Sequence, residues 1–260
     1  MYKTKTLLFL LTFLTSAIYA QDYKGVFAII NDVDGYSNVR NSSKKIIGRI
    51  IDYEVFAIAS FLDKADNVYV PIIYGWGLPD IFTRFGWGEK ASDKLKEKEG
   101  FIHQSRVKYL YDLPRLTKTL TKDRKIVFSN NDATFNIVIG AFDKMQHKIG
   151  KDQFGCDATI DSYPIHGIDG EIEYKLYDGS IRKATEIKSI HCVIDGDSFS
   201  FQKEHLCGYL EPNTDSMYMV KAATNVYYLV MLNSDGAGGY EIVWTIKDKK
   251  IKSAITFRDF

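Results

Sequence analysis

The fold is decided by two stretches of this 260-residue sequence, Asp34-Gly35-Tyr36-Ser37-Asn38-Val39-Arg40 and Gly100-Phe101-Ile102-His103-Gln104-Ser105-Arg106. The pair Asp34-Gly35 predicts a tight turn, because Gly tolerates the left-handed backbone that such turns need. In the strand that follows, alternation points Val39 inward. Asn38 is suited to satisfy backbone groups where the strand bends, and Arg40 to pair with a carboxylate. The first stretch therefore predicts a turn that leads into a half-buried strand.

Most of the remaining chain also reads as short strands. Runs rich in Val, Ile, Tyr and Phe alternate with Gly, Asn and Asp, and the aromatic content is 14% with only five prolines. The expected helices are few and short: Ala91–Glu99, part of Val107–Leu120, and Lys203–Gly208. The sequence predicts an all-β protein with little helix.

The two opening stretches resemble the first and last strands of a bacterial Src-homology-3-like (SH3b) domain, with Ile46–Ile50 and Glu54–Ile58 at the usual strand positions between them. The resemblance covers about the first half of the chain. It implies an SH3-like barrel that binds a ligand, with peptidoglycan or a peptide as the partner, and it implies no catalysis.

The N-terminus has the layout of a secretory signal peptide over residues 1–20. Lys3 and Lys5 precede the apolar run Leu7–Leu14, and small residues lead to a cleavage point after Ala20. We expect an exported protein, periplasmic or secreted. Cleavage would leave 32 basic residues against 33 acidic ones, because two of the 34 basic residues lie in the signal peptide. This balance offers no case for nucleic-acid binding, and no later stretch is long and apolar enough to span a membrane.

The mature chain divides into two predicted domains, an SH3-like domain over 21–112 and an all-β domain over 113–260. Leu113-Pro114 ends one element, and the polar segment Thr117–Asp123 reads as a connector. The second domain is expected to be a β-sandwich or compact β-barrel, and it is similar to an uncharacterised β domain that accompanies SH3b modules. The pieces that match are Phe142–Lys144, Thr185–Val193 with Asp195-Gly196, Leu210–Asn213, and Asn233–Tyr240 with Val243-Trp244. That resemblance implies only the position of the boundary between the two domains.

One face of the last β-meander is expected to form the core of the second domain. Alternation places four apolar side chains on this face: Tyr240, Ile242, Trp244 and Ile246.

An aromatic insertion at 73–99 interrupts the first domain. It carries Tyr74-Gly75-Trp76-Gly77 and Phe85-Gly86-Trp87-Gly88, so two of the three tryptophans lie in one Gly-flanked loop. Two interpretations stay open. The loop could close over the barrel groove, with the ligand bound by Tyr36, Tyr74, Trp76, Phe85 and Trp87. It could instead dock onto its own barrel or the neighbouring domain, since burying one Trp is worth on the order of 5 kcal/mol.

The sequence predicts no catalytic residue, cofactor or metal ion. Three Asp-rich segments read as hairpin turns rather than calcium loops: Asp32–Gly35, Asp195–Asp197 and Asn233–Gly236. The five histidines show no metal-binding spacing. His191 and Cys192 are adjacent, so a strand would point them to opposite faces. Cys156, Cys192 and Cys207 leave open any one disulfide pair or three buried thiols.

The sequence thus favours an exported, non-enzymatic binding protein whose SH3-like module recognises peptidoglycan or a protein or peptide of the cell envelope. Two alternatives belong to other classes. One is a cell-wall hydrolase whose site lies in the second domain, with acids from the region Asp157–Glu173. The other is a structural or inhibitory partner of another envelope protein.

Overall fold

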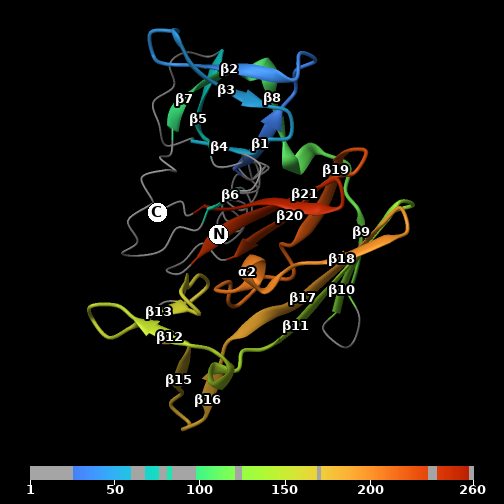
Figure 1. Cartoon of the computed structure of the whole chain (residues 1–260). Helices are drawn as coiled ribbons and strands as arrows, with labels where there is room; N and C mark the ends of the chain where they lie inside the picture. Colours follow the sequence, from blue (N-terminus) through green and yellow to red (C-terminus); the bar gives the residue numbers. More distant parts are fainter. Residues whose placement is uncertain are drawn as a thin grey trace, which may run out of the picture.

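The computed structural model describes residues 26–59, 68–75, 81–83, 98–120, 125–168, 171–233 and 239–257. Within these ranges the chain is all-β, as predicted: the strands form five sheets, and the single α-helix, α2 (Lys203–Leu206), has four residues (Figure 1). None of the helices in the described ranges has the length and apolar character needed to cross a membrane.

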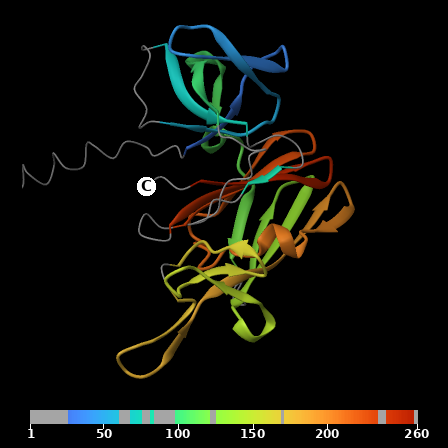
Figure 2. The same cartoon turned by 60° about the vertical axis from the view of Figure 1, so that its left-hand side comes forward.

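The first half of the chain forms a seven-stranded sheet of order β3-β2-β7-β5-β4-β1-β8. Figures 1 and 2 show this sheet curled around its own core. Val39 of β2 and Ile102 of β7 are fully buried there, so the inward orientation predicted for Val39 is confirmed. The strands are β1 Phe27–Ile30, β2 Tyr36–Arg40, β3 Ile46–Ile51, β4 Phe56–Ile58, β5 Tyr69–Tyr74, β7 Lys98–His103 and β8 Val107–Tyr109.

The second half contributes two larger sheets. The outer sheet has the order β18-β17-β11-β10-β9, and the middle sheet the order β19-β20-β21-β22-β6. The outer strands are β9 Thr117–Leu120, β10 Lys125–Ser129, β11 Ala133–Ala141, β17 Thr185–Ile194 and β18 Asp197–Ser200. The middle strands are β6 Ile81–Thr83, β19 Tyr218–Ala223, β20 Val226–Asn233, β21 Tyr240–Lys247 and β22 Lys250–Phe257.

The middle sheet is buried on both faces, because it lies between the outer sheet and the curled sheet (Figure 1). Trp244 and Ile246 pack against outer-sheet side chains such as Phe135. Val243, on the opposite face of β21, shares a second core with Val55 of the curled sheet. Tyr240 and Ile242 join Trp244 and Ile246 in one core, which confirms the predicted face of β21. Through these two apolar interfaces the middle sheet packs against the outer sheet on one face and against the curled sheet, the barrel, on the other.

The aromatic insertion also reaches the middle sheet. Its strand β6 runs parallel to β22, with Ile81 opposite Ser253 and Thr83 opposite Ile255. The insertion is therefore joined to the neighbouring sheet through its backbone at residues 81–83.

Two small sheets extend the far end of the second half: β12-β13-β14 and the hairpin β15-β16 (Figure 1). Their strands are β12 Ile149–Lys151, β13 Asp157–Ile160, β14 Tyr163–Pro164, β15 Glu173–Lys175 and β16 Ile181–Lys183. They surround a small core that includes Phe142, Ile160 and Leu210.

The helix predictions were right at α2, right in small part within Val107–Leu120, and wrong at Lys98 and Glu99. Lys203–Gly208 contains α2, but Val107–Leu120 holds the strands β8 and β9 with the 3-10 turn η2 (Leu110–Asp112) between them. Of the third predicted helix, Lys98 and Glu99 belong to β7, and residues 91–97 lie outside the described ranges. Pairing with β5 decides the conformation there, since tertiary contacts override local propensity.

The predicted turn at Asp195-Gly196 is confirmed. Both residues have left-handed φ angles, 49° and 82°, and they join the paired strands β17 and β18.

Candidate functional site

A polar cleft of about 310 Å³ lies on the barrel where the two opening stretches meet. Its volume falls in the range of small-ligand sites, about 300–1,000 Å³. β2, the turn before it and the end of β7 supply most of its walls. The lining residues are Asp32, Asp34, Tyr36, Ser37, Asn38, Arg40, Tyr69, His103, Ser105 and Arg106.

Asp32 organises the charges of the cleft. Its Oδ1 lies 2.8 Å from Nη1 of Arg106, and its Oδ2 accepts a 2.8 Å hydrogen bond from the Ser37 hydroxyl. This carboxylate therefore ties the first stretch to the second. The hydrogen bond from Ser37, more than the charge of Arg106, lowers the pKa of Asp32. The cleft thus keeps a carboxylate and a guanidinium side by side at neutral pH.

Two tyrosines stand in the cleft walls. Tyr36 is 37% exposed, and the guanidinium of Arg49 lies 4.5 Å from its ring centre. Tyr69 meets the ring of His103 edge to face at 5.5 Å. The His103 Nδ1 lies 2.8 Å from the hydroxyl of Ser105, so the imidazole is held at the end of β7. Half-exposed rings backed by cations offer flat faces for a ligand.

Asn38 contributes an acceptor without a hydrogen-bond partner among the described residues. Its Oδ1 is buried although the residue lines the cleft. Buried polar atoms are nearly always hydrogen-bonded. A ligand that donates a hydrogen bond to this oxygen would therefore satisfy it. The neighbouring Arg40 donates from Nη1 to the carbonyl of Lys44 at 2.7 Å, rather than to the carboxylate that we expected.

The predicted ligand-binding residues take different positions. Tyr36 lines the cleft. Tyr74 ends β5 inside the barrel core with 3% of its surface exposed, and burial raises the pKa of its hydroxyl. Trp76, Phe85 and Trp87 lie outside the described ranges. The structure therefore brings together Tyr36 with residues that we did not predict, above all Asp32 and Tyr69.

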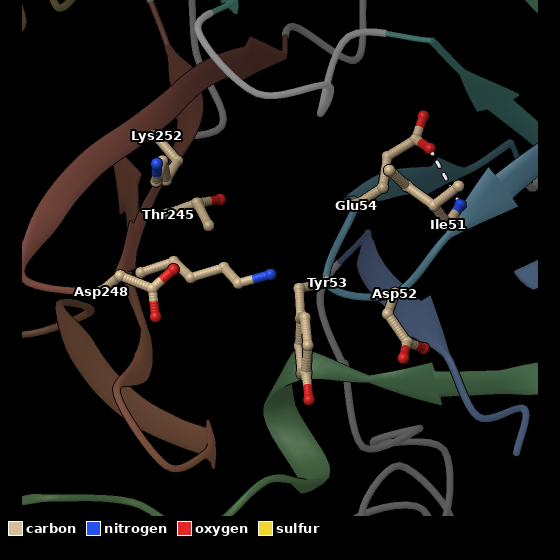
Figure 3. A pocket seen from close by; sticks show the side chains of 8 residues that line it. Ile51, Asp52, Tyr53, Glu54, Thr245, Asp248 and Lys252 are labelled. Carbon is tan, nitrogen blue, oxygen red and sulfur yellow. Dashed lines mark hydrogen bonds between the residues drawn. The ribbon is translucent and has the colours of Figure 1, made fainter. Parts of the chain in front are cut away.

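A second hollow, of about 130 Å³, separates the barrel from the middle sheet. Figure 3 shows Tyr53 and Glu54 on one wall and Thr245, Asp248 and Lys252 on the other. The Lys247 ammonium lies 4.7 Å from the centre of the Tyr53 ring, and burial raises the pKa of Glu54. Its volume lies well below that of small-ligand sites, so the barrel cleft is the better candidate.

The region proposed for a hydrolase, Asp157–Glu173, holds a buried carboxylate. Asp157 pairs with Lys151 at 2.6 Å and Lys144 at 3.3 Å, and it accepts a hydrogen bond from the backbone of Ile172. These partners lower the pKa of Asp157 although burial alone would raise it. This ion-paired carboxylate joins three segments of the small core.

The structure also shows where the three cysteines and His191 lie. Cys156, Cys192 and Cys207 form no disulfide with one another. His191 is exposed and Cys192 is buried, so the opposite faces predicted for this pair are confirmed. Burial raises the pKa of the Cys192 thiol to about 12, which makes it inert.

Comparisons with protein-family models, with curated proteins and with solved structures found no match to this chain.

Proposed function

We propose that the curled sheet is an SH3b-type binding module, and that its cleft binds a peptide-bearing ligand of the cell envelope without catalysis. One observation carries the proposal. The two stretches that resemble SH3b domains line a single polar cleft, although they are far apart in the sequence. Peptidoglycan, with its short stem peptides, is the ligand class that we favour.

The chemistry of the cleft supports a ligand with both charges and hydrogen-bonding groups. Arg106 and Arg40 suit a carboxylate, whereas Asp34 suits an amino group. Asn38 Oδ1 can accept a hydrogen bond from an amide N–H. Tyr36 and Tyr69 provide flat surfaces for the apolar parts of a peptide or for a sugar ring. Stem peptides carry all of these groups.

We further propose that the chain is exported, since the ligand lies outside the cytoplasm and residues 1–20 have the layout of a signal peptide. The insertion would then add Trp76, Phe85 and Trp87 to the binding surface. Its anchoring through β6 is compatible with a loop held beside the barrel.

The test is co-sedimentation of residues 21–260 with insoluble peptidoglycan. Three variants are compared with the wild type: Tyr36→Ser/Tyr69→Ser in the cleft, Trp76→Ala/Trp87→Ala in the insertion, and Tyr177→Ser as a control. Tyr177 is a fully exposed tyrosine at the tip of the hairpin β15-β16, in the other half of the chain. Thermal melting of each variant shows whether it is folded.

We expect the wild type and Tyr177→Ser to sediment with peptidoglycan, and the cleft variant to remain in the supernatant with an unchanged melting temperature. If the wild type does not sediment, the ligand class is wrong. If the folded cleft variant sediments like the wild type, the cleft is not the site. Release of muropeptide fragments into the supernatant would show that the function is hydrolysis rather than binding alone.

A further inference from the structure

A group of side chains in the second half has the composition of a transition-metal site. The donor atoms of His147, Asp161 and Cys207 all lie within 4.8 Å of one another. They come from three segments: the end of the 3-10 turn η3 (Lys144–Gln146), the turn between β13 and β14, and the end of α2. An imidazole nitrogen, a carboxylate oxygen and a sulfur form a ligand set typical of Zn²⁺.

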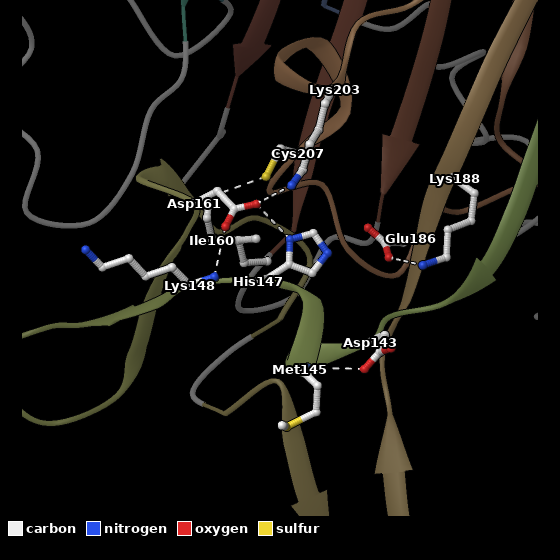
Figure 4. Close-up of polar contacts among 10 residues, drawn as sticks. All are labelled: Asp143, Met145, His147, Lys148, Ile160, Asp161, Glu186, Lys188, Lys203 and Cys207. Carbon is white, nitrogen blue, oxygen red and sulfur yellow. Dashed lines mark hydrogen bonds and ion pairs between the residues drawn. The ribbon is translucent and has the colours of Figure 1, made fainter.

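The three donors point toward one another, as Figure 4 shows. The Nδ1 of His147 lies 2.8 Å from Oδ2 of Asp161. The Cys207 Sγ lies beside this pair and donates to the carbonyl of Ile160 at 3.3 Å. In a tetrahedral zinc site with bonds of about 2.0–2.3 Å, neighbouring donors stand roughly 3.3–3.8 Å apart. The cluster is therefore close to the required spacing, and its donors need to move by about 1 Å at most.

The surroundings hold the donors in place. The ring of His147 stacks on Phe142 at 4.7 Å, and the Lys148 amide donates to Oδ1 of Asp161 at 2.9 Å. The side chains of His147 and Asp161 are 10% and 23% exposed, and Cys207 is buried. Fixed orientation by outer contacts is what metal sites use to position their ligands.

A cation already occupies this cluster. The Lys203 ammonium lies 2.7 Å from Oδ2 of Asp161, and Figure 4 shows its side chain reaching this carboxylate. The Lys203 side chain is 64% exposed, so it can leave toward solvent without breaking any packed core. An ammonium paired with a carboxylate of the cluster marks a position where a positive charge is favourable.

We propose that His147, Asp161 and Cys207 bind Zn²⁺ with a water molecule as the fourth ligand, and that the metal displaces the ammonium of Lys203. The thiol loses its proton to solvent when the Zn–S bond forms, and no oxidation or reduction takes place. The ion would add a further link between the η3 segment, the β13–β14 turn and α2, where the backbone amide of Asp161 already donates to the carbonyl of Lys148 at 2.8 Å. This site is separate from the barrel cleft and does not depend on the function proposed for it.

The first test uses Co²⁺ as a spectroscopic substitute, added to the reduced full chain. We expect the visible bands of tetrahedral Co²⁺ together with a thiolate-to-metal charge-transfer band. The Cys207→Ser variant should lose the charge-transfer band, whereas Cys192→Ser and Cys156→Ser should keep it. His147→Gln should weaken binding at least tenfold, in line with the loss of one ligand.

The Lys203→Met variant gives a second test of metal binding, and this test does not depend on whether Cys207→Ser folds. Because the metal no longer competes with an ammonium, this variant should bind Co²⁺ more tightly than the wild type. Zn²⁺ at a hundredfold excess over its dissociation constant should raise the melting temperature of the wild type by roughly 5–10 °C. The absence of a charge-transfer band in the wild type, its persistence in Cys207→Ser, or an unchanged affinity in Lys203→Met would each overturn the proposal.

Discussion

The middle sheet and the barrel cleft use tyrosine in opposite ways. Tyr228 and Tyr240 are fully buried between layers, and burial raises the pKa of both hydroxyls well above its usual range. Tyr36 and Tyr69 stand partly exposed beside charged groups of the cleft. On a strand whose two faces are both covered, tyrosine therefore holds the layers together. On a strand with one open face, tyrosine is available to a ligand.

The largest expected effect belongs to the middle sheet. Trp244→Ala should lower the free energy of unfolding by about 3–5 kcal/mol, because the substitution leaves a cavity in the largest core and removes the hydrogen bond from Nε1 to the carbonyl of His205. Denaturant unfolding measures it, with Tyr177→Ala as an exposed aromatic control that should change by less than about 0.5 kcal/mol. Equal losses in the two variants would contradict the account of the middle sheet.

On the barrel side, Gly100→Ala should cost about 1–3 kcal/mol. A Cβ at Gly100 would lie 2.4 Å from Cγ1 of Val39, whose side chain is fully buried and cannot move aside cheaply. The same substitution should also weaken ligand binding, because β7 and β2 carry the two stretches of the cleft. Thermal melting and co-sedimentation check both effects, and an unchanged melting temperature would show that Val39 is loosely packed.

A smaller effect is expected where the two halves meet. Tyr228→Phe removes the hydrogen bond from its hydroxyl to the carbonyl of Tyr53 at 3.0 Å, with a cost of about 1 kcal/mol. Two separate unfolding transitions in this variant, where the wild type has one, would show that this contact couples the layers. A fully wild-type melting curve would mean that apolar packing alone holds them.

The smallest expected effect is a pH dependence in the cleft. The pKa of Asp32 is lowered from its ordinary value of 3.8 in the folded protein, so its carboxylate stabilises the fold above about pH 3.8. That contribution is lost as the pH falls through the folded pKa. The melting temperatures of the wild type and Asp32→Asn should differ at pH 6, and the difference should shrink as the pH is lowered step by step below 3.8. A difference that persists in acid would exclude the carboxylate as its cause.

Local patterns predicted the parts of the fold that repeat every second residue. The all-β class, the shared face of Trp244 and Ile246, and the inward position of Val39 all follow from alternation. The same rule places Tyr74 on the face of its near neighbour Ile72, inside the barrel core. The neighbouring Gly75 favours an open loop, but the pairing of Tyr74 with Lys98 of β7 keeps Tyr74 in the strand.

Contacts between distant segments could not be predicted from the sequence. The cluster of His147, Asp161 and Cys207 depends on three turns that meet only in the folded chain, so the histidine spacing carried no sign of it. The place of Tyr69 in the cleft was not predicted for the same reason. Its ring contacts His103, which belongs to another strand. The parallel pairing of β6 with β22 likewise depends on where the barrel sits.

Hydrogen exchange of the chain from Gln21, with and without soluble peptidoglycan fragments, tests the central claim most directly. We expect slower exchange upon ligand addition in two separate segments, residues 34–40 and 100–106, with unchanged exchange in the already protected strands β20 and β21. Fragments that bind but leave both segments unchanged, or that protect only the second half, would contradict the assignment of the cleft as the binding site.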